Sequence, residues 1–296
     1  MTEIGRNTSH HRLELPDGGE VELAWGVATH TGHRRRHNED SFVASPPLFA
    51  VADGMGGHSA GDLASAAVVR RLAEATADIV GAPSEIGAAL HLATQDIAEV
   101  SDEASLGVGT TVTGAMLTIE EGEASWLVFN VGDSRVYVVD AGVLAQVTVD
   151  HSVVQEMVDA GMISASEAEA HPDSNIITRA VGFNADPVPD FWHIPLRTGM
   201  RLLLCSDGLT KEVDLETIEG VLTAGSAAAV VVDELVERAL QAGGRDNVTA
   251  VVVDVLSAPG GDGEATGPRG DDDAADEEDT LPPTGELPAP GSDREE

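Results

Sequence analysis

The segment from Thr110 to Val149 restricts the fold more than any other part of the chain, because apolar stretches of strand length follow one another there with only short turns between them. A short turn leaves no room for a crossover connection, so consecutive strands must pair in antiparallel fashion. The apolar stretches are Thr110–Ile119, Ala124–Val131, Arg135–Val139 and Leu144–Val149, and the turns are Glu120–Gly122, Gly132–Ser134 and Asp140–Gly142. The sequence therefore predicts an antiparallel β-meander in the middle of the chain.

Helices are predicted before and after this meander in the sequence. The Ala-rich segments Ala60–Val80 and Ser84–Glu99 space their apolar residues three and four apart, and Pro83 separates them, which indicates two adjacent helices. Further strands are predicted at Val21–Thr29, Phe42–Ala44, Leu48–Ala52, Arg201–Cys205 and Val248–Val255, a helix at Ala227–Gln241, and short helical pieces within 151–183. Because strands and helices do not alternate as β-α-β units, the pattern indicates the α+β class with antiparallel sheet.

One folded domain is expected, because 296 residues with 42% hydrophobic content are enough to bury a sizeable core. The composition changes after Leu256, beyond which aliphatic residues are scarce and Gly, Pro, Asp and Glu dominate. We expect a polar N-terminal leader over residues 1–20, the folded domain over 21–256, and an acidic disordered tail over 257–296.

The formal net charge of −36 excludes several classes of partner. Nucleic acids and anionic lipid surfaces attract proteins with a surplus of Lys and Arg, so neither is expected as a partner. A single cysteine, Cys205, rules out an intramolecular disulfide and agrees with a reducing compartment. The polar N-terminus resembles no signal peptide, and no apolar run is long enough to span a membrane. A cytoplasmic monomer is expected.

Four aspartates lie where an apolar strand meets a turn. They are Asp53 in LFAVADGMGG, Asp133 in FNVGDSR, Asp207 in LLLCSDG and Asp246 in GGRDNVTAVVV. Any one of them is explained by an Asx-turn or a helix cap, since Asp readily hydrogen-bonds its own backbone. Together with Asn38-Glu39-Asp40 in an acidic chain, they indicate convergence on hard divalent cations, which prefer oxygen ligands.

Paired divalent cations favour one kind of chemistry. They activate a water molecule and stabilise both oxygens of an in-line phosphoryl displacement, so phosphate ester hydrolysis is the expected reaction. Zinc is disfavoured because the His and Cys residues show no ligand spacing typical of zinc sites. The basic run Arg34–Arg36 is a candidate phosphate grip, since a guanidinium matches phosphate oxygens in bidentate fashion. The alternative is a solvated basic turn that pairs with Glu39 and Asp40.

Seven ordered motifs together resemble the bacterial branch of the protein phosphatase 2C family of metal-dependent serine/threonine phosphatases. They are RRRHNEDSF, FAVADGMGGHSAG, GTTVTGAML, VGDSRVYVV, TVDHSVVQEMVDAGMI, LLLCSDGL and GGRDNVTAVVV. The resemblance covers about Leu23 to Val255. It implies an α-β-β-α sandwich of two antiparallel β-sheets flanked by helix pairs, with metals at one end between the sheets.

The resemblance also implies roles for individual residues. Asp53 would bridge two metals, Gly54 would offer its carbonyl to one, and Asp207 and Asp246 would bind the other. Arg35 would hold the substrate phosphate, and Glu39 and Asp40 would order metal-bound waters. Asp133, shared with Asp207, would belong to a third metal site of bacterial members, with Asn175 as a flap ligand. Residues 151 to about 183 would form this flap beside the active site.

The implied activity is hydrolysis of phosphoserine and phosphothreonine by direct attack of a water bound to two metals. The cofactors would be Mn²⁺ or Mg²⁺, two per active site with a third in some members, and the substrates phosphorylated proteins, in opposition to bacterial serine/threonine kinases. His58 in GGHSAG is a candidate general acid. Animal members place their acid histidine directly after Asp-Gly, where this chain has Met55, so metal-bound water is the alternative donor.

Three rival hypotheses remain at this point. A cysteine-dependent phosphatase needs a thiolate in a loop closed by arginine, and Cys205 is followed by Ser206-Asp207-Gly208 without one. A regulatory module that keeps the fold and loses its metals is opposed by the aspartates at positions 53, 207 and 246. The sequence does not separate a phosphatase that opposes kinases from one devoted to an anti-sigma-factor antagonist.

Overall fold

Two β-sheets form the centre of the computed structural model, which describes residues 1–56, 60–75, 82–100, 107–183 and 186–259. These residues all belong to one unit of the chain, Met1–Gly261. The first sheet has the order β1-β4-β5-β7-β8-β12, with β6 paired to β5 and β11 paired to β6. The second has the order β10-β9-β13-β14-β3-β2.

The strands of the first sheet are β1 (Glu3–Gly5), β4 (Asp40–Ser45), β5 (Leu48–Met55), β6 (Gly109–Thr110), β7 (Val112–Glu120), β8 (Glu123–Val131), β11 (Val181–Gly182) and β12 (Asp190–Pro195). Those of the second are β2 (Thr8–Glu14), β3 (Glu20–His30), β9 (Arg135–Asp140), β10 (Val143–Gln146), β13 (Arg201–Cys205) and β14 (Val248–Ser257). The predicted meander is present, but it is divided: β7 and β8 lie in one sheet, while β9 and β10 lie in the other.

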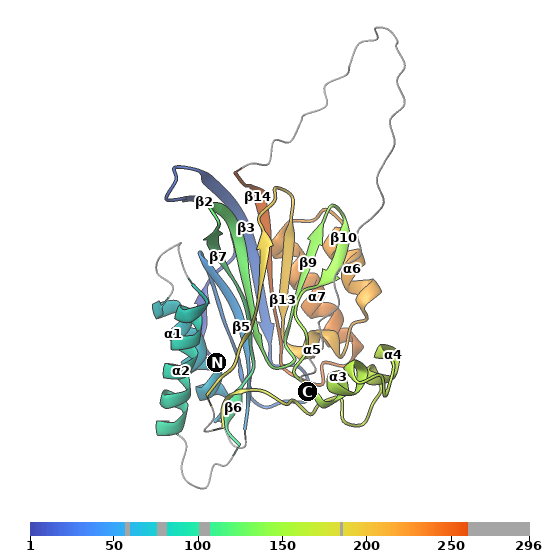
Figure 1. Ribbon diagram of the computed structural model, residues 1–296. Helices are drawn as coiled ribbons and strands as arrows, with labels where there is room; N and C mark the ends of the chain where they lie inside the picture. The colour runs from blue at the N-terminus through green and yellow to red at the C-terminus, as the bar shows by residue number, and fades with distance from the viewer. Residues whose placement is uncertain (57–59, 76–81, 101–106, 184–185, 260–296) are drawn as a thin grey trace, which may run out of the picture. The chain divides into compact units, whose positions relative to one another are not determined.

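Helices cover the outer face of each sheet (Figure 1). The pair α1 (Gly61–Ala75) and α2 (Pro83–Val100) packs on the first sheet, and the pair α6 (Leu215–Thr223) and α7 (Ala228–Ala242) packs on the second. Between the sheets lies a third core, in which Phe49 contacts Trp25 and Trp126 edge to face, with ring centroids 5.4 and 6.0 Å apart. The predicted α-β-β-α sandwich is therefore confirmed.

The prediction that both sheets are antiparallel is wrong at one strand. Strand β1 pairs with β4 in parallel, with Glu3 opposite Phe42. Residues 1–20, expected only as a polar leader, thus contribute β1 to one sheet and β2 to the other. Their polar, exposed side chains give no apolar pattern, because both strands lie at sheet edges.

The remaining elements lie near the end of the sheets where β5 and β13 finish. Within residues 151–183, α3 (Val153–Asp159) and α4 (Ala165–Glu169) are the predicted short helices, and α5 (Asp207–Thr210) directly follows β13. The expected tail falls almost wholly in residues 260–296, outside the described residues. Among the helices of the described chain, none has the length and apolar character needed to cross a membrane.

Candidate active site

The predicted carboxylates come from both sheets and act on one another. Asp40 opens β4 and is the direct cross-strand partner of Asp53 on β5. Asp133 lies in the turn between β8 and β9, Asp207 begins α5, and Asp246 precedes β14. Burial raises the pKa of Asp53 well above its usual value, and the charges of the other four aspartates raise it further. The structure therefore gathers residues up to 206 positions apart at one end of the sandwich.

Asp40 is fully buried, and its two carboxylate oxygens have different surroundings. Its Oδ2 accepts hydrogen bonds from Ser206 Oγ at 2.9 Å and from Thr249 Oγ1 at 2.7 Å, whereas its Oδ1 is buried and none of the described residues donates to it. Burial raises the pKa of Asp40 to about 7, the two hydroxyls oppose that rise, and the charges of Asp207 and Asp246 add to it. A buried carboxylate with an unpaired oxygen is a ready ligand or water acceptor.

Ser206 and Thr249 were missed by the sequence analysis. Ser206 directly follows β13 and Thr249 lies in β14, so both lie at the second sheet. Their hydroxyls connect this sheet to Asp40 on the first sheet. Ser206 Oγ also accepts a hydrogen bond from the Thr249 backbone at 3.0 Å, so one hydroxyl fixes two elements. The only available signal was that Ser206 stands directly before Asp207 and Thr249 shortly after Asp246.

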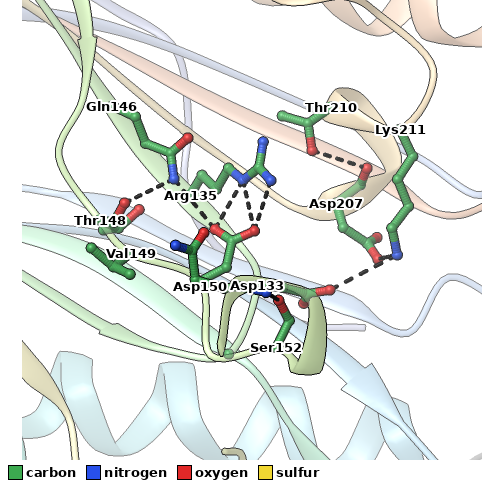
Figure 2. A network of polar contacts seen from close by, with 12 residues as sticks. Asp133, Arg135, Gln146, Thr148, Val149, Asp150, Ser152, Asp207, Thr210 and Lys211 are labelled. Carbon is green, nitrogen blue, oxygen red and sulfur yellow. Dashed lines mark hydrogen bonds and ion pairs between the residues drawn. The ribbon is translucent and has the colours of Figure 1, made fainter. Parts of the chain in front are cut away.

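Asp133 and Asp207 share a cationic neighbour, the Lys211 ammonium (Figure 2). Lys211 Nζ contacts Asp207 Oδ2 and lies 3.8 Å from Asp133 Oδ2. Burial and the charge of Asp207 raise the pKa of Asp133 to about 7, against the opposing effect of Lys211. Burial disfavours the ammonium of Lys211, but Asp207 and Asp133 outweigh it and raise its pKa. Asp207 Oδ1 is buried, and no partner for it is found among the residues that the structure describes.

Lys211 is the third residue that the sequence analysis missed, and here a signal existed. It is the only lysine among 296 residues, although the chain has fifteen arginines. It stands four positions after Asp207, which is one helical turn away and within reach of the carboxylate.

Gly54 is required by a close approach between chain segments. A Cβ at this position would lie 2.1 Å from the Gly61 carbonyl oxygen and 2.7 Å from that of Glu39. The Gly54 backbone N–H donates to Glu39 at 3.2 Å. The backbone at Gly54 does not have a positive φ, unlike that at Gly56, whose φ is 144°. Gly54 thus lets the end of β5 lie against the start of α1.

Arg35 lies at the same end of the sandwich. Its Nη2 donates to Asp246 Oδ2 at 2.7 Å, and 53% of its side chain is exposed. It therefore pairs with Asp246, and not with Glu39 or Asp40 as the alternative reading of the basic run supposed. The charges of Asp53 and Glu39 also act on the guanidinium and contribute to its raised pKa. An exposed guanidinium beside buried carboxylates is well placed to meet an anionic substrate.

Glu39 and the loop around it are held by Asn247, a fourth residue that the sequence analysis missed. Asn247 Oδ1 accepts from the Glu39 backbone at 2.8 Å, and its Nδ2 donates to the carbonyls of Thr31 and His37 at 2.9 and 3.0 Å. Partial burial raises the pKa of Glu39, and the charge of Asp62 raises it further. One amide thus fixes both ends of the arginine-bearing loop next to Asp246.

Three further predictions concern the surroundings of the site. His58 lies outside the described residues. Asn175 is exposed in the turn 172–175, and among the described residues no hydrogen bond joins it to Asp133 or Asp207. The segment 151–183 is fastened beside the site, because His151 exchanges two hydrogen bonds with Gly132, one of 2.9 Å from its backbone and one of 3.1 Å to its Nδ1. The roles of His58 and Asn175 stay predictions.

Cys205 is buried in β13, and burial raises the pKa of its thiol to about 12. Such a thiol is protonated at neutral pH and is not a nucleophile. The cysteine-dependent mechanism therefore has no support in the structure.

The carboxylate cluster fits a hard divalent cation, although its side chains are not arranged around one. Among the described residues, no three His, Cys, Asp or Glu side chains stand close enough together to hold a metal ion as they are. Arg35 and Lys211 contact two of the expected ligands instead. The site nevertheless lacks positive charge. Asp40 and Asp207 each have a buried oxygen without a partner among the described residues, and the pKa values of Asp40 and Asp53 are raised. Oxygen donors of this kind suit Mg²⁺ and Mn²⁺.

An acidic end of an α-β-β-α sandwich, with an arginine beside it, defines a metal-dependent hydrolase of phosphate esters as the class to which fold and site point. Residues 29–256 match the sequence model of protein phosphatase 2C, and the chain belongs to this family. The resemblance seen in the sequence is therefore confirmed.

Two characterised relatives have similar sequences. Serine/threonine protein phosphatase PstP of Mycobacterium tuberculosis is 39% identical over 270 residues, which cover 88% of this chain and 50% of that protein. The chain thus spans about half the length of this relative. Serine/threonine phosphatase stp of Listeria monocytogenes is 36% identical over 239 residues, which cover 76% of this chain and 93% of that protein.

Solved structures are similar over the same region. The crystal structure of the M. tuberculosis phosphatase PstP/Ppp has a TM-score of 0.74 and 38% identity, covering 80% of this chain and 100% of that one. A catalytic domain of PstP in complex with two manganese ions has a TM-score of 0.69 and 35% identity, covering 80% and 99%.

Proposed function

We propose that this chain is a metal-dependent protein phosphatase that hydrolyses phosphoserine and phosphothreonine in proteins. The observation that carries the proposal is the cluster of buried, mutually repelling carboxylates beside the exposed guanidinium of Arg35. The names of the relatives, which are serine/threonine phosphatases, support the same activity.

Divalent cations are the proposed cofactors, with Asp53, the Gly54 carbonyl, Asp207 and Asp246 as the residues that would hold them. Mn²⁺ is supported by the manganese-containing structure of the M. tuberculosis relative, and Mg²⁺ by the oxygen-only ligand set. When bound, a pair of such ions supplies an activated water and neutralises charge on the phosphoryl group.

The protein's own side chains have separate tasks in this proposal. Arg35 exchanges its contact with Asp246 for the substrate phosphate, because its guanidinium is exposed and can form two parallel hydrogen bonds to phosphate oxygens. Asp40 and Glu39 accept hydrogen bonds from water in the site, and Ser206 and Thr249 hold Asp40 in position for this. The proton for the leaving serine or threonine oxygen comes from His58 or from water.

The proposed substrates are phosphorylated proteins, and the proposed partners are serine/threonine kinases or their targets. The exposed segment 151–183 beside the site offers a surface for substrate selection. A cytoplasmic, monomeric protein remains our expectation from the sequence.

The test is hydrolysis of an aryl phosphate and of a phosphothreonine peptide with Mn²⁺, with Mg²⁺ and with chelator. We expect activity with either metal and none with chelator, and a loss of about 10³-fold in Asp246→Ala, which is about 4 kcal/mol of transition-state stabilisation. Glu234→Gln, on the exposed face of α7, is the matched control and keeps full activity. Activity that persists in chelator contradicts the metal mechanism, and inactivity with every metal favours the regulatory module.

A further inference from the structure

The side chain of Lys211 has a fixed position relative to two of the carboxylates. Asp207 begins the short helix α5, and Lys211 follows at its C-terminal end, where the backbone N–H of Lys211 donates to the Asp207 carbonyl at 2.9 Å. The ammonium turns back along the helix to Asp207 Oδ2 and extends toward Asp133 Oδ2 (Figure 2). Only 36% of the Lys211 side chain is exposed, so the protein encloses most of its length.

The two oxygens of Asp207 are used differently. Oδ2 is taken by Lys211, while Oδ1 is buried and has no hydrogen-bond partner within the part of the chain that the structure describes. A carboxylate can serve two cations, one through each oxygen. The side of Asp207 that faces Asp133 is therefore already neutralised, whereas the other oxygen is free for a cation shared with the rest of the cluster.

An ammonium and a divalent cation exclude each other between Asp133 and Asp207. Both need the same carboxylate oxygens at close range, and a protonated amine repels a metal ion and cannot coordinate it. The ammonium is tethered through four methylene groups to the end of the helix that also carries Asp207, so it is present at high local concentration.

We propose that Lys211 is an internal cation that replaces a divalent metal between Asp133 and Asp207, so that the chain binds one metal ion fewer than its carboxylates would otherwise hold. This inference rests on the proposed function, because it concerns the number of cofactor ions at the same site. It argues against the third metal that the family resemblance implied for Asp133 and Asn175.

The test is the number of Mn²⁺ ions bound at saturation, measured by equilibrium dialysis and atomic emission on the full chain. We expect Lys211→Gln to bind one Mn²⁺ more than the unsubstituted protein, and Lys211→Arg, which keeps the charge, to bind the same number as the unsubstituted protein. Arg238→Gln is the control for loss of a positive charge, because Arg238 pairs with Glu234 on the exposed face of α7. Equal Mn²⁺ counts in Lys211→Gln and the unsubstituted protein overturn the inference.

A second measurement needs no substitution. Because Lys211 is the only lysine, ¹⁵N-lysine labelling gives a single side-chain ammonium signal in the NMR spectrum. We expect that signal to persist when Mg²⁺ saturates the protein, since the ammonium stays between the carboxylates and exchanges slowly with water. Its loss on Mg²⁺ binding overturns the inference even if Lys211→Gln does not fold.

The two proposals fail in different ways. If neither the unsubstituted protein nor Lys211→Gln binds Mn²⁺, the proposed metal-dependent function fails, and this inference fails with it. If both bind Mn²⁺ in equal number, only the assignment of Lys211 fails.

Discussion

Two buried ionic clusters lie next to each other in this protein, and only one of them is balanced (Figure 2). Arg135 donates to both oxygens of Asp150 at 2.7 to 3.1 Å and to the Tyr137 hydroxyl at 3.1 Å, while Gln146 donates to Asp150 at 3.3 Å. Asp133, in the turn just before Arg135 and β9, instead faces Asp207, a like charge, with Lys211 as their shared cation.

The Arg135–Asp150 pair and the carboxylate cluster differ in how buried charge is compensated. Burial disfavours the charged guanidinium of Arg135, but Asp150 outweighs this effect and raises the pKa of Arg135. The hydrogen bonds between Arg135 and Asp150 connect β9 to the start of the segment 151–183. The carboxylate cluster retains unpaired oxygens at Asp40 and Asp207 and raised pKa values at Asp40, Asp53 and Asp133. Imbalance of charge, more than burial itself, therefore marks the candidate active site.

Removal of the central carboxylate should have the largest effect. We expect Asp53→Asn to lower kcat/KM by about 10³-fold, about 4 kcal/mol, because Asp53 is the proposed ligand of both cations. In chelator the same variant should be at least as stable as the unsubstituted protein, since a repelled buried charge is removed. Phosphatase kinetics and urea denaturation measure the two effects. Full activity, or a clear loss of stability in chelator, would contradict the proposed role.

The balanced pair should respond in the opposite way. Asp150→Asn leaves the Arg135 guanidinium buried without its counter-ion, so we expect the free energy of unfolding to fall by about 3 kcal/mol. Glu234→Gln removes a partner of the exposed Arg238 and should cost less than about 1 kcal/mol. Urea denaturation in chelator measures both. Equal losses in the two variants would mean that Arg135 and Asp150 contribute no more than a surface ion pair.

The smallest expected change is that of stability over one pH unit in chelator. The pKa values of Asp40 and Asp133 are about 7 in the folded protein against an ordinary value of 3.8, so the folded state binds more protons between these limits. Unfolding then releases protons, and stability should fall as the pH rises from about 4 to about 7. Each group contributes at most about 1.4 kcal/mol per pH unit.

Urea denaturation at several pH values measures this slope. Asp40→Asn should make it shallower, and saturating Mn²⁺ should remove or reverse it, because cations bind the deprotonated carboxylates and stabilise the folded state. A slope of zero in chelator for the unsubstituted protein would mean that the carboxylates are not repelling one another.

Much of the fold followed from local patterns. Short turns in the segment Thr110–Val149 predicted antiparallel pairing, and the apolar spacing predicted the pair α1 and α2, because both depend on neighbours in sequence. Helix α7 was also predicted. Strands β2 and β12 and helix α6 were not predicted. The strands lie at sheet edges with mixed burial, and α6 is only nine residues long.

The sequence by itself was enough to predict candidate side chains for the chemistry: the aspartates at strand ends, Arg35, and Gly54 in the turn after Asp53. Only the tertiary structure decided how their charges are balanced. Thr249 contacts Asp40 across 209 positions of the chain, and Arg35 contacts Asp246 across 211. Lys211, which follows α5, contacts Asp133 in the turn between β8 and β9. Electrostatic balance depends on distances through space, and residue order along the chain does not specify those distances until the sheets have packed.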